Sequence, residues 1–154
     1  MRELHIKELK FARVADVKVP NRAHKQDAGL DLFVPNDFKP VTLKLGDSIL
    51  IPSGIKFEIP DNYMLKIFNK SGVASKKGLI VGAEVCDSRY SGIVHVNLHK
   101  VSGEPITINP GDKIAQAILI PIETPDVVEV SESELYGGIT TERASGGFGS
   151  TGDK

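Results

Sequence analysis

Glycine and proline interrupt this chain at short intervals, and this spacing restricts its regular segments to a few residues each. The 154 residues include 15 glycines and 9 prolines. Between these breaks apolar and polar residues alternate over 55–59 and 94–99, a short apolar run occupies 119–120, and 127–130 is predicted to form a late strand. Alternation with a period of two is typical of half-buried strands. With turn signals about every ten residues, the sequence predicts an all-β jelly-roll, barrel or sandwich.

A single short helix is predicted, over residues 71–77. We expect Ser71 to cap its N-terminus and Gly78 to stop it. Two other segments, 41–49 and 106–114, share the order strand, Gly-Asp turn, strand. Common turn chemistry explains this likeness, and so does a structural pseudo-repeat. Both explanations support β structure.

The composition excludes several classes of protein. The 19 basic and 20 acidic residues give a net charge of −1, without the basic surplus of proteins that bind nucleic acid through its phosphates. Because Cys86 is the one cysteine, an internal disulfide and a zinc site of several cysteines are excluded. No apolar run approaches the ~20 residues that span a bilayer, and the N-terminus does not resemble a signal peptide. We expect a soluble, cytoplasmic protein without nucleic-acid or membrane partners.

The C-terminal segment differs in composition from the rest of the chain. Residues 131–154 contain six glycines and seven serines or threonines, with few apolar anchors. Such a segment buries too little surface to offset the entropy of ordering it. We therefore expect a β-rich domain over 1–130 and a flexible arm over 131–154. The arm is either a dispensable tail or, with its cation, aromatic ring and small residues, a cover for a phosphate chain and a flat ring.

Five motifs follow one another along the chain. They are Ala-Gly-Leu-Asp-Leu at 28–32, Asn-Lys-Ser-Gly-Val-Ala at 69–74, Val-Cys-Asp-Ser-Arg-Tyr-Ser-Gly at 85–92, Gly-Asp-Lys-Ile-Ala-Gln at 111–116 and Gly-Gly-Phe-Gly-Ser-Thr-Gly at 146–152. Together they closely resemble the motifs of the trimeric deoxyuridine triphosphatases (dUTPases). The resemblance implies a jelly-roll-like fold and Mg²⁺-dependent hydrolysis of dUTP to dUMP and pyrophosphate, by attack of water on the α-phosphorus. Such an enzyme limits uracil incorporation into DNA and supplies dUMP for thymidylate synthesis.

Two residues of the third motif match the chemistry of that reaction. Asp87 matches the family's water-activating carboxylate, and it follows a predicted strand end that aims it at a pocket. Tyr90 matches the tyrosine whose ring packs on the deoxyribose and leaves no volume for a ribose hydroxyl. Taken alone, an aspartate here is more often a turn former and a tyrosine more often a core residue.

The resemblance assigns uracil recognition to main-chain groups of a hairpin over 79–87. In this chain the matching positions are Gly82, Ala83 and Val85. Their amides and carbonyls are expected to read the edge of the base. The chain departs from the family at Glu84, where glycine is usual, and the added charge changes the surroundings of the pocket.

The second and fourth motifs imply phosphate binding. Ser71 and Gly72 open the predicted helix, where free amide groups attract anions, and Gln116 is expected to donate from a strand. Lys70 stands where the family normally has arginine, and Asn69 replaces the usual proline. Because lysine lacks the bidentate fork of arginine, we expect a looser orientation of the phosphates.

Metal binding is expected to depend on the substrate. Asp31 matches the first-motif aspartate, which supports the network of metal and phosphates without ligating the metal directly. No cluster in the sequence holds Mg²⁺ through protein ligands alone, as expected for an ion carried on substrate phosphates. His95 and His99 share one face of a predicted strand, but zinc requires at least a third ligand, so we expect both at the surface.

The resemblance also implies a homotrimer whose active sites are shared. One subunit supplies the first, second and fourth motifs, another the hairpin, and the third its C-terminal arm. That arm is expected to bring Arg143 to the phosphates and Phe148 over uracil, with Gly149 and Ser150 beside them, when substrate binds.

Two other functions remain open. dCTP deaminases have a related fold, although the complete fifth motif and the pairing of Asp87 with Tyr90 favour phosphohydrolysis. A dUTP-binding regulatory protein with a protein partner can use the same scaffold. A zinc deaminase is excluded because one cysteine cannot supply its two cysteine ligands.

Overall fold

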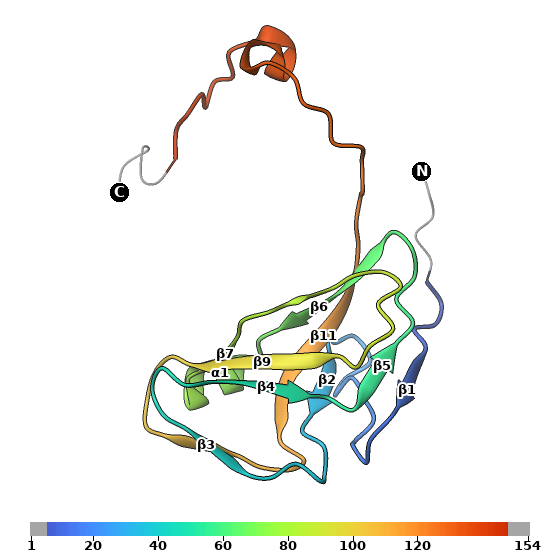
Figure 1. The fold of residues 1–154 in the computed structure, drawn as a ribbon, viewed down its shortest axis with the longest axis vertical. Helices are drawn as coiled ribbons and strands as arrows, with labels where there is room; N and C mark the ends of the chain where they lie inside the picture. The colour runs from blue at the N-terminus through green and yellow to red at the C-terminus, as the bar shows by residue number, and fades with distance from the viewer. Residues whose placement is uncertain (1–5, 148–154) are drawn as a thin grey trace. The chain divides into compact units, whose positions relative to one another are not determined.

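The computed structural model describes residues 6–147, and the chain divides into two units, 1–123 and 124–154. The first unit contains the helix Ser71–Lys77 (α1) and the strands found in the described part of the chain (Figure 1). The strands are Phe11–Arg13 (β1), Leu30–Phe33 (β2), Val41–Leu43 (β3), Ser48–Pro52 (β4), Ile55–Phe57 (β5), Tyr63–Phe68 (β6), Leu79–Val81 (β7), Val85–Cys86 (β8), His95–Lys100 (β9), Ile106–Ile108 (β10) and Lys113–Pro121 (β11).

The strand pairings are antiparallel and form two larger sheets and two ribbons. One larger sheet has the order β2-β11-β6-β8, and the other has the order β4-β9-β7. The ribbons pair β1 with β5 and β3 with β10. The two larger sheets share no strand among the described residues, so the arrangement is sandwich-like rather than a closed barrel. This confirms the predicted all-β, jelly-roll-like fold.

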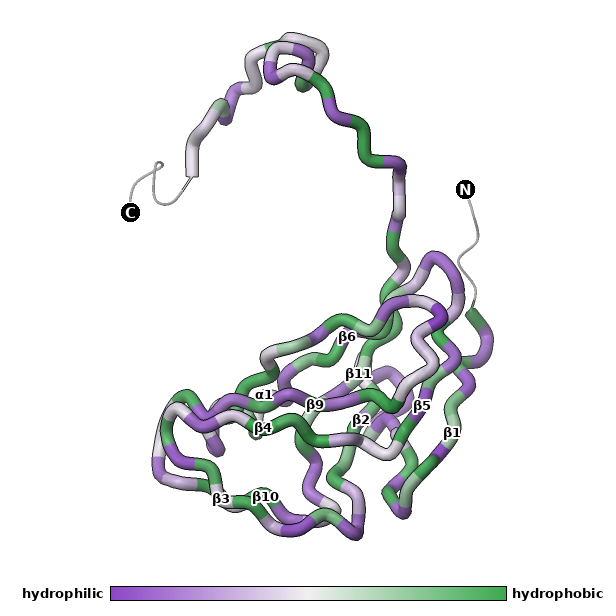
Figure 2. Tube along the Cα trace, in the orientation of Figure 1, coloured by the Kyte–Doolittle hydropathy of each residue, from purple (hydrophilic) through white to green (hydrophobic). Residues whose placement is uncertain are grey.

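The core lies between the inner faces of the two larger sheets. In β6, Leu65 and Ile67 are buried and alternate with half-buried neighbours, and in β9 Val96 and Leu98 are buried and alternate with exposed or half-buried neighbours. All four belong to one buried cluster, which confirms the predicted alternation over 94–99. In Figure 2 hydrophobic and hydrophilic residues alternate along β9. Each such side chain contributes about 1.5–3 kcal/mol when fully buried, so these faces hold the two sheets together.

Helix α1 spans Ser71–Lys77, as predicted, but its first cap differs from the prediction. Lys70 occupies the N-cap position with extended backbone angles, φ −98° and ψ 133°, and makes no side-chain cap. Ser71 is therefore the first helical residue, and its assignment as N-cap is wrong. At the other end Gly78 adopts a left-handed φ of 60° and donates its N–H to the carbonyl of Val73, which confirms the predicted stop.

The two similar segments share the same turn chemistry, one of the two explanations that the sequence allowed. Asp47 and Asp112 each accept a backbone N–H from the residue three positions earlier, at 2.8 Å. The strands before these turns, β3 and β10, pair with each other, and the hydroxyls of Thr42 and Thr107 lie 2.7 Å apart across the pair. Each turn leads into a different sheet, so the turns connect layers and do not form hairpins.

The second unit has no strand where one was predicted, and a short helix follows that position. Residues 127–130 are described and carry no strand, and Val127 is 98% exposed, so the strand prediction there is wrong. A 3-10 segment, η1, spans Glu132–Gly138 and begins with a capping box between Ser131 and Glu134. The Ser131 hydroxyl donates to Glu134 Oε2 at 2.5 Å, and this bond lowers the pKa of the Glu134 carboxyl. The spacing Ser-x-x-Glu was the available signal for this segment.

Candidate active site

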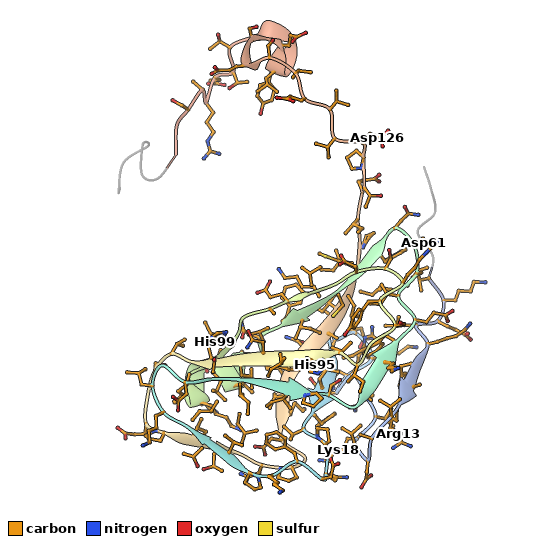
Figure 3. The ribbon with its side chains drawn as sticks, in the orientation of Figure 1. Arg13, Lys18, Asp61, His95, His99 and Asp126 are labelled. Carbon is orange, nitrogen blue, oxygen red and sulfur yellow. The ribbon has the colours of Figure 1, made fainter. Side chains whose placement is uncertain are left out.

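Four of the predicted site residues line one cavity in the first unit. Ala83, Val85, Asp87 and Tyr90 surround a volume of about 320 Å³. The rest of the lining comes from Leu50, Ile67, Glu84, Cys86 and His95. His95 lies on β9, and His99 lies farther along the same strand (Figure 3).

A larger hollow, of about 640 Å³, lies beside the cavity and shares only Tyr90 with it. Its lining includes Lys10, Phe11 and the ion pair of Asp61 with Arg89. None of the other predicted site residues lines it. We therefore place the candidate site in the smaller cavity, where the carboxylate and the aromatic ring occur together.

The segment over 79–87 crosses between the sheets, and the prediction of a hairpin there is wrong. β7 pairs with β9 in one sheet, whereas β8 pairs with β6 in the other. The crossing leaves Gly82 outside the cavity lining and Ala83 on it. The carbonyl of Glu84 accepts the N–H of Ile67 at 2.8 Å, which fixes the start of β8 against β6.

Asp87 follows directly after β8, as predicted, and begins the turn that leads to Tyr90. Its carbonyl accepts the N–H of Tyr90 at 3.2 Å, so Asp87 is both a turn former and a residue of the cavity. Next to it, burial raises the pKa of the Cys86 thiol, and the negative charge of Asp87 raises it further. The cysteine is therefore a neutral, half-buried wall of the cavity.

Tyr90 is held over the cavity from one side and is not a core residue. Tyr90 is 43% exposed, and its hydroxyl donates to the carbonyl of Ile93 at 3.0 Å. The same carbonyl lies 2.9 Å from Nδ1 of His95. A Cβ at Gly92 would lie 2.3 Å from the Tyr90 hydroxyl, so only glycine at that position lets the ring fold back. These contacts orient the ring.

The charge of Glu84 is compensated within the same sheet. Its carboxylate lies 2.9 Å from Nζ of Lys66, and that ammonium lies 4.8 Å from the ring centroid of Phe68. The side chain is therefore drawn toward β6. Glu84, in place of the expected glycine, therefore lines the cavity, and its charge is compensated by Lys66.

A second group of predicted residues surrounds the buried carboxylate of Asp31. Asp31 is 2% exposed and binds the ammonium groups of Lys70, through Oδ1, and Lys113, through Oδ2 at 2.7 Å. Burial alone raises the pKa of Asp31, but the hydrogen bonds and positive charges of the two lysines outweigh it and hold the pKa below its usual value. Lys113 was not predicted as a site residue, although it lies within the fourth motif.

Gln116 is positioned by Asn69 and by the absence of a side chain at Gly29. Its Nε2 donates to the carbonyl of Asn69 at 2.8 Å. A Cβ at Gly29 would lie 2.1 Å from Oε1 of Gln116, so the first motif makes room for the side chain of the fourth. Asn69 also accepts the N–H of Val81 on its Oδ1 at 2.7 Å. It thereby joins this group to the segment that leads to the cavity.

The remaining predicted residues lie apart from these contacts. Ser71 and Gly72 are exposed at the start of α1, and a Cβ at Gly72 would meet nothing within 4 Å. In the second unit, Nε of Arg143 donates to the carbonyl of Gly146 at 2.9 Å. Phe148, Gly149 and Ser150 lie outside the described residues. Within 6–147, no group of three or more histidine, cysteine, aspartate or glutamate side chains could hold a metal ion, and no helix is long and apolar enough to span a membrane.

Comparison with known proteins identifies the family. The dUTPase family model matches residues 15–152. This chain belongs to the dUTPase family. It is 39% identical over 140 residues to the deoxyuridine 5'-triphosphate nucleotidohydrolase of Mycolicibacterium gilvum, with 89% of each chain covered. It is 38% identical to the enzyme of the same name from Neorickettsia sennetsu, covering 96% of this chain and 97% of that one.

Solved structures of phage dUTPases have the same fold. A variant of the dUTPase of Staphylococcus bacteriophage 80alpha, solved with dUpNHpp, matches with a TM-score of 0.82 and 26% identity over 96% of this chain and 99% of that chain. A dUTPase variant from phage phi11 of S. aureus, in which a structural Mg(II) ion is coordinated, matches with a TM-score of 0.73 and 26% identity over 82% of this chain and 99% of that one.

Proposed function

We propose that this protein hydrolyses dUTP to dUMP and pyrophosphate. One observation supports this most directly: in a chain of the dUTPase family, Asp87 and Tyr90 line the same cavity. The first is the residue expected to activate water, and the second is the residue expected to select the sugar. In a cell this reaction limits uracil incorporation into DNA and supplies dUMP for thymidylate synthesis.

In the proposed mechanism, Asp87 accepts a proton from the attacking water. The turn that begins at Asp87 fixes its backbone, since its carbonyl is bonded to the amide of Tyr90. The water attacks the α-phosphorus, and pyrophosphate leaves. A positioned base of this kind typically contributes about 10²- to 10⁴-fold in rate.

The group around Asp31 is proposed to bind the phosphates. The ammonium of Lys70 has three donors, and Asp31 accepts one of them, so the same ammonium can also donate to phosphate. Asp31 holds Lys70 and Lys113 in place, and both lysines carry charge opposite to that of a triphosphate. Gln116, Ser71 and Gly72 are proposed to complete the phosphate contacts.

Selection of deoxyribose is proposed to come from the ring of Tyr90, and selection of uracil from the main chain of 82–85. The bond from the Tyr90 hydroxyl to the carbonyl of Ile93 prevents the ring from swinging away to admit a ribose hydroxyl. The amide of Ala83 already donates to Oδ1 of Asn97, at 3.1 Å. Ala83 is therefore proposed to contact the base through groups other than its N–H.

Mg²⁺ is the proposed cofactor, carried by the triphosphate. The described residues fit this arrangement because both carboxylate oxygens of Asp31 are bonded to lysines, which occupies them away from the ion. When bound, the ion neutralises phosphate charge. Asp31 acts on the ion only through the lysines and phosphates.

The proposed active form is a homotrimer. The residues of the cavity and those bonded around Asp31 and Gln116 share no member, as expected if two subunits supply the halves of each site. The arm over 131–154, with Arg143, Phe148, Gly149 and Ser150, is proposed to close over the site of a neighbouring subunit. Sedimentation analysis of the purified protein tests the trimer.

A nucleotide panel tests the proposed function. We expect Mg²⁺-dependent release of pyrophosphate from dUTP and much slower release from dTTP, dCTP and UTP. Asp87→Asn is the matched control, because it keeps the size of the side chain and removes the base. Release of ammonia from dCTP, without pyrophosphate from dUTP, would assign the chain to deamination instead. Binding of dUTP without turnover would indicate a regulatory protein.

A further inference from the structure

Three consecutive backbone amides, at residues 81–83, are held by two asparagines. The N–H of Val81 donates to Oδ1 of Asn69 at 2.7 Å. The N–H of Gly82 donates to the backbone carbonyl of Asn97 at 2.9 Å, and the N–H of Ala83 donates to its Oδ1 at 3.1 Å. This segment joins β7 to the cavity wall that begins at Ala83.

We propose that Asn97 and His99 are positioning residues that fix the conformation of Gly82 and Ala83, and through them the base-binding wall of the cavity. The inference rests on the proposed function and extends it to two residues outside the five motifs. Neither side chain lines the cavity. Both lie on β9, the strand that pairs with β7, and Figure 3 labels His99 on that strand.

The orientation of the Asn97 amide is fixed by two further bonds. Its Nδ2 donates to the carbonyl of Ile49 on β4 at 3.2 Å. Because Nδ2 faces Ile49, Oδ1 faces the crossing segment, where it can accept from Ala83. Nε2 of His99 lies 2.9 Å from the same Oδ1, and since this oxygen only accepts, the histidine nitrogen is the donor. A reversed amide would turn Nδ2, a donor, toward the N–H groups of Ala83 and His99, which are donors as well.

Gly82 is the position at which the chain meets this pair. A Cβ there would lie 2.3 Å from Oδ1 of Asn97 and 2.4 Å from Nε2 of His99. The backbone of Gly82 therefore lies directly on the two polar groups. Gly82, Asn97 and His99 together fix the backbone conformation of residues 82–83, with the Ala83 amide directed toward β9.

This backbone conformation matters for recognition of the base because main-chain groups have no rotamers with which to adapt. A base edge is read by fixed donors and acceptors only if their positions vary by a fraction of a bond length. Releasing the Ala83 amide from Asn97 would leave that amide without its acceptor and allow the wall to shift. The expected consequence is weaker nucleotide binding, with the carboxylate of Asp87 left in place.

The test compares Asn97→Leu with Asn97→Asp in the full-length protein. Leucine keeps the approximate volume and removes the acceptor, whereas aspartate retains an acceptor oxygen. Thr107→Val is the control, since it removes a side-chain hydrogen bond on β10, outside the cavity. The readouts are the Kd of dUMP by calorimetry, KM and kcat for dUTP, and the melting temperature.

We expect Asn97→Leu to raise the Kd of dUMP and the KM of dUTP by about three- to tenfold, the effect of one lost hydrogen bond, with kcat changed less than twofold. Asn97→Asp keeps the acceptor for Ala83 but loses the donor to Ile49, so it should recover part of the affinity, and Thr107→Val should bind as the wild type does. If Asn97→Leu fails to fold, His99→Leu provides the same test with a smaller expected loss, about twofold.

Two results would overturn the proposal while leaving the proposed function intact. One is a wild-type enzyme that hydrolyses dUTP and an Asn97→Leu variant with unchanged Kd and KM, even if its melting temperature falls. The other is a Thr107→Val variant that binds as weakly as Asn97→Leu, because the effect would then not be specific to the contacts of Asn97. Failure of the wild type itself to hydrolyse dUTP would overturn the proposed function and this extension together.

Discussion

Replacing Asp31 by asparagine tests whether the buried carboxylate organises the proposed phosphate site. The substitution keeps the shape of the side chain and removes its charge. It leaves the ammonium groups of Lys70 and Lys113 next to a neutral amide. Removing one member of a fully buried ion pair costs about 3–5 kcal/mol. Here the lysine side chains are 26% and 42% exposed, so water replaces part of the lost interaction, and we expect a loss of about 2 kcal/mol.

The expected change is measurable by thermal unfolding and has a characteristic pH dependence. For a chain of this size, about 2 kcal/mol lowers Tm by roughly 4–8 °C at neutral pH. The folded-state pKa of Asp31 lies below its unfolded value, so the carboxylate stabilises the fold at pH above about 4. This contribution is lost as the pH falls through the folded-state pKa. The difference in Tm between wild type and variant should therefore shrink in acid.

Asp61→Asn provides the matched control. Asp61 also forms an ion pair, with Arg89, but both side chains are largely exposed, at 58% and 81%. Loss of this ion pair in Asp61→Asn should leave Tm equal to that of the wild type within the scatter of repeated measurements. The reasoning about Asp31 is refuted if Asp31→Asn melts with the wild type at pH 7, or if its difference from the wild type does not change with pH.

Three further predictions concern the proposed reaction, each measured by steady-state release of pyrophosphate. Tyr90→Ala should raise the turnover of UTP relative to dUTP by about tenfold, because it opens volume for the ribose hydroxyl; an unchanged sugar preference would contradict this role. A chain that ends at Thr141 should keep the fold of 1–123, checked by circular dichroism, and lose most dUTP hydrolysis; normal turnover would exclude the arm from the site. Gly29→Ala should displace Gln116, because the new Cβ would lie 2.1 Å from its Oε1, and should raise KM for dUTP about tenfold; an unchanged KM would remove Gln116 from phosphate binding.

The sequence predicted the parts of the fold that depend on local pattern. The alternation over 94–99, the bounds of α1 and the stop at Gly78 are confirmed because they follow from the local period of apolar residues and from the positive φ that glycine accepts. The hairpin over 79–87 was wrong because β7 and β8 each pair with a strand distant in sequence. A short strand does not encode its partner, and pairing is decided by the packing of the whole sandwich.

Prediction of the candidate site had the same limit. The motifs correctly indicated that Ala83, Val85, Asp87 and Tyr90 would lie together, since three of the four belong to one motif and the fourth lies two residues before it. Lys113 was missed as the second partner of Asp31, because its bond joins β11 to β2 and depends on sheet order. The strand predicted over 127–130 failed because its valines have no buried face in the described unit.

The departures from the family pattern are compensated by contacts elsewhere in the fold. Glu84 replaces glycine and is paired with Lys66 on the adjacent strand, so its charge does not face the cavity alone. Asn69 replaces proline and uses the polar side chain it gains to hold the amide of Val81. Lys70 replaces arginine, and because a lysine ammonium is a point charge without a fixed fork, its orientation depends on Asp31. Glu84 with Lys66 and Lys70 with Asp31 are pairs of side chains, so exchanging both members of a pair should be tolerated better than reverting Glu84 or Lys70 alone.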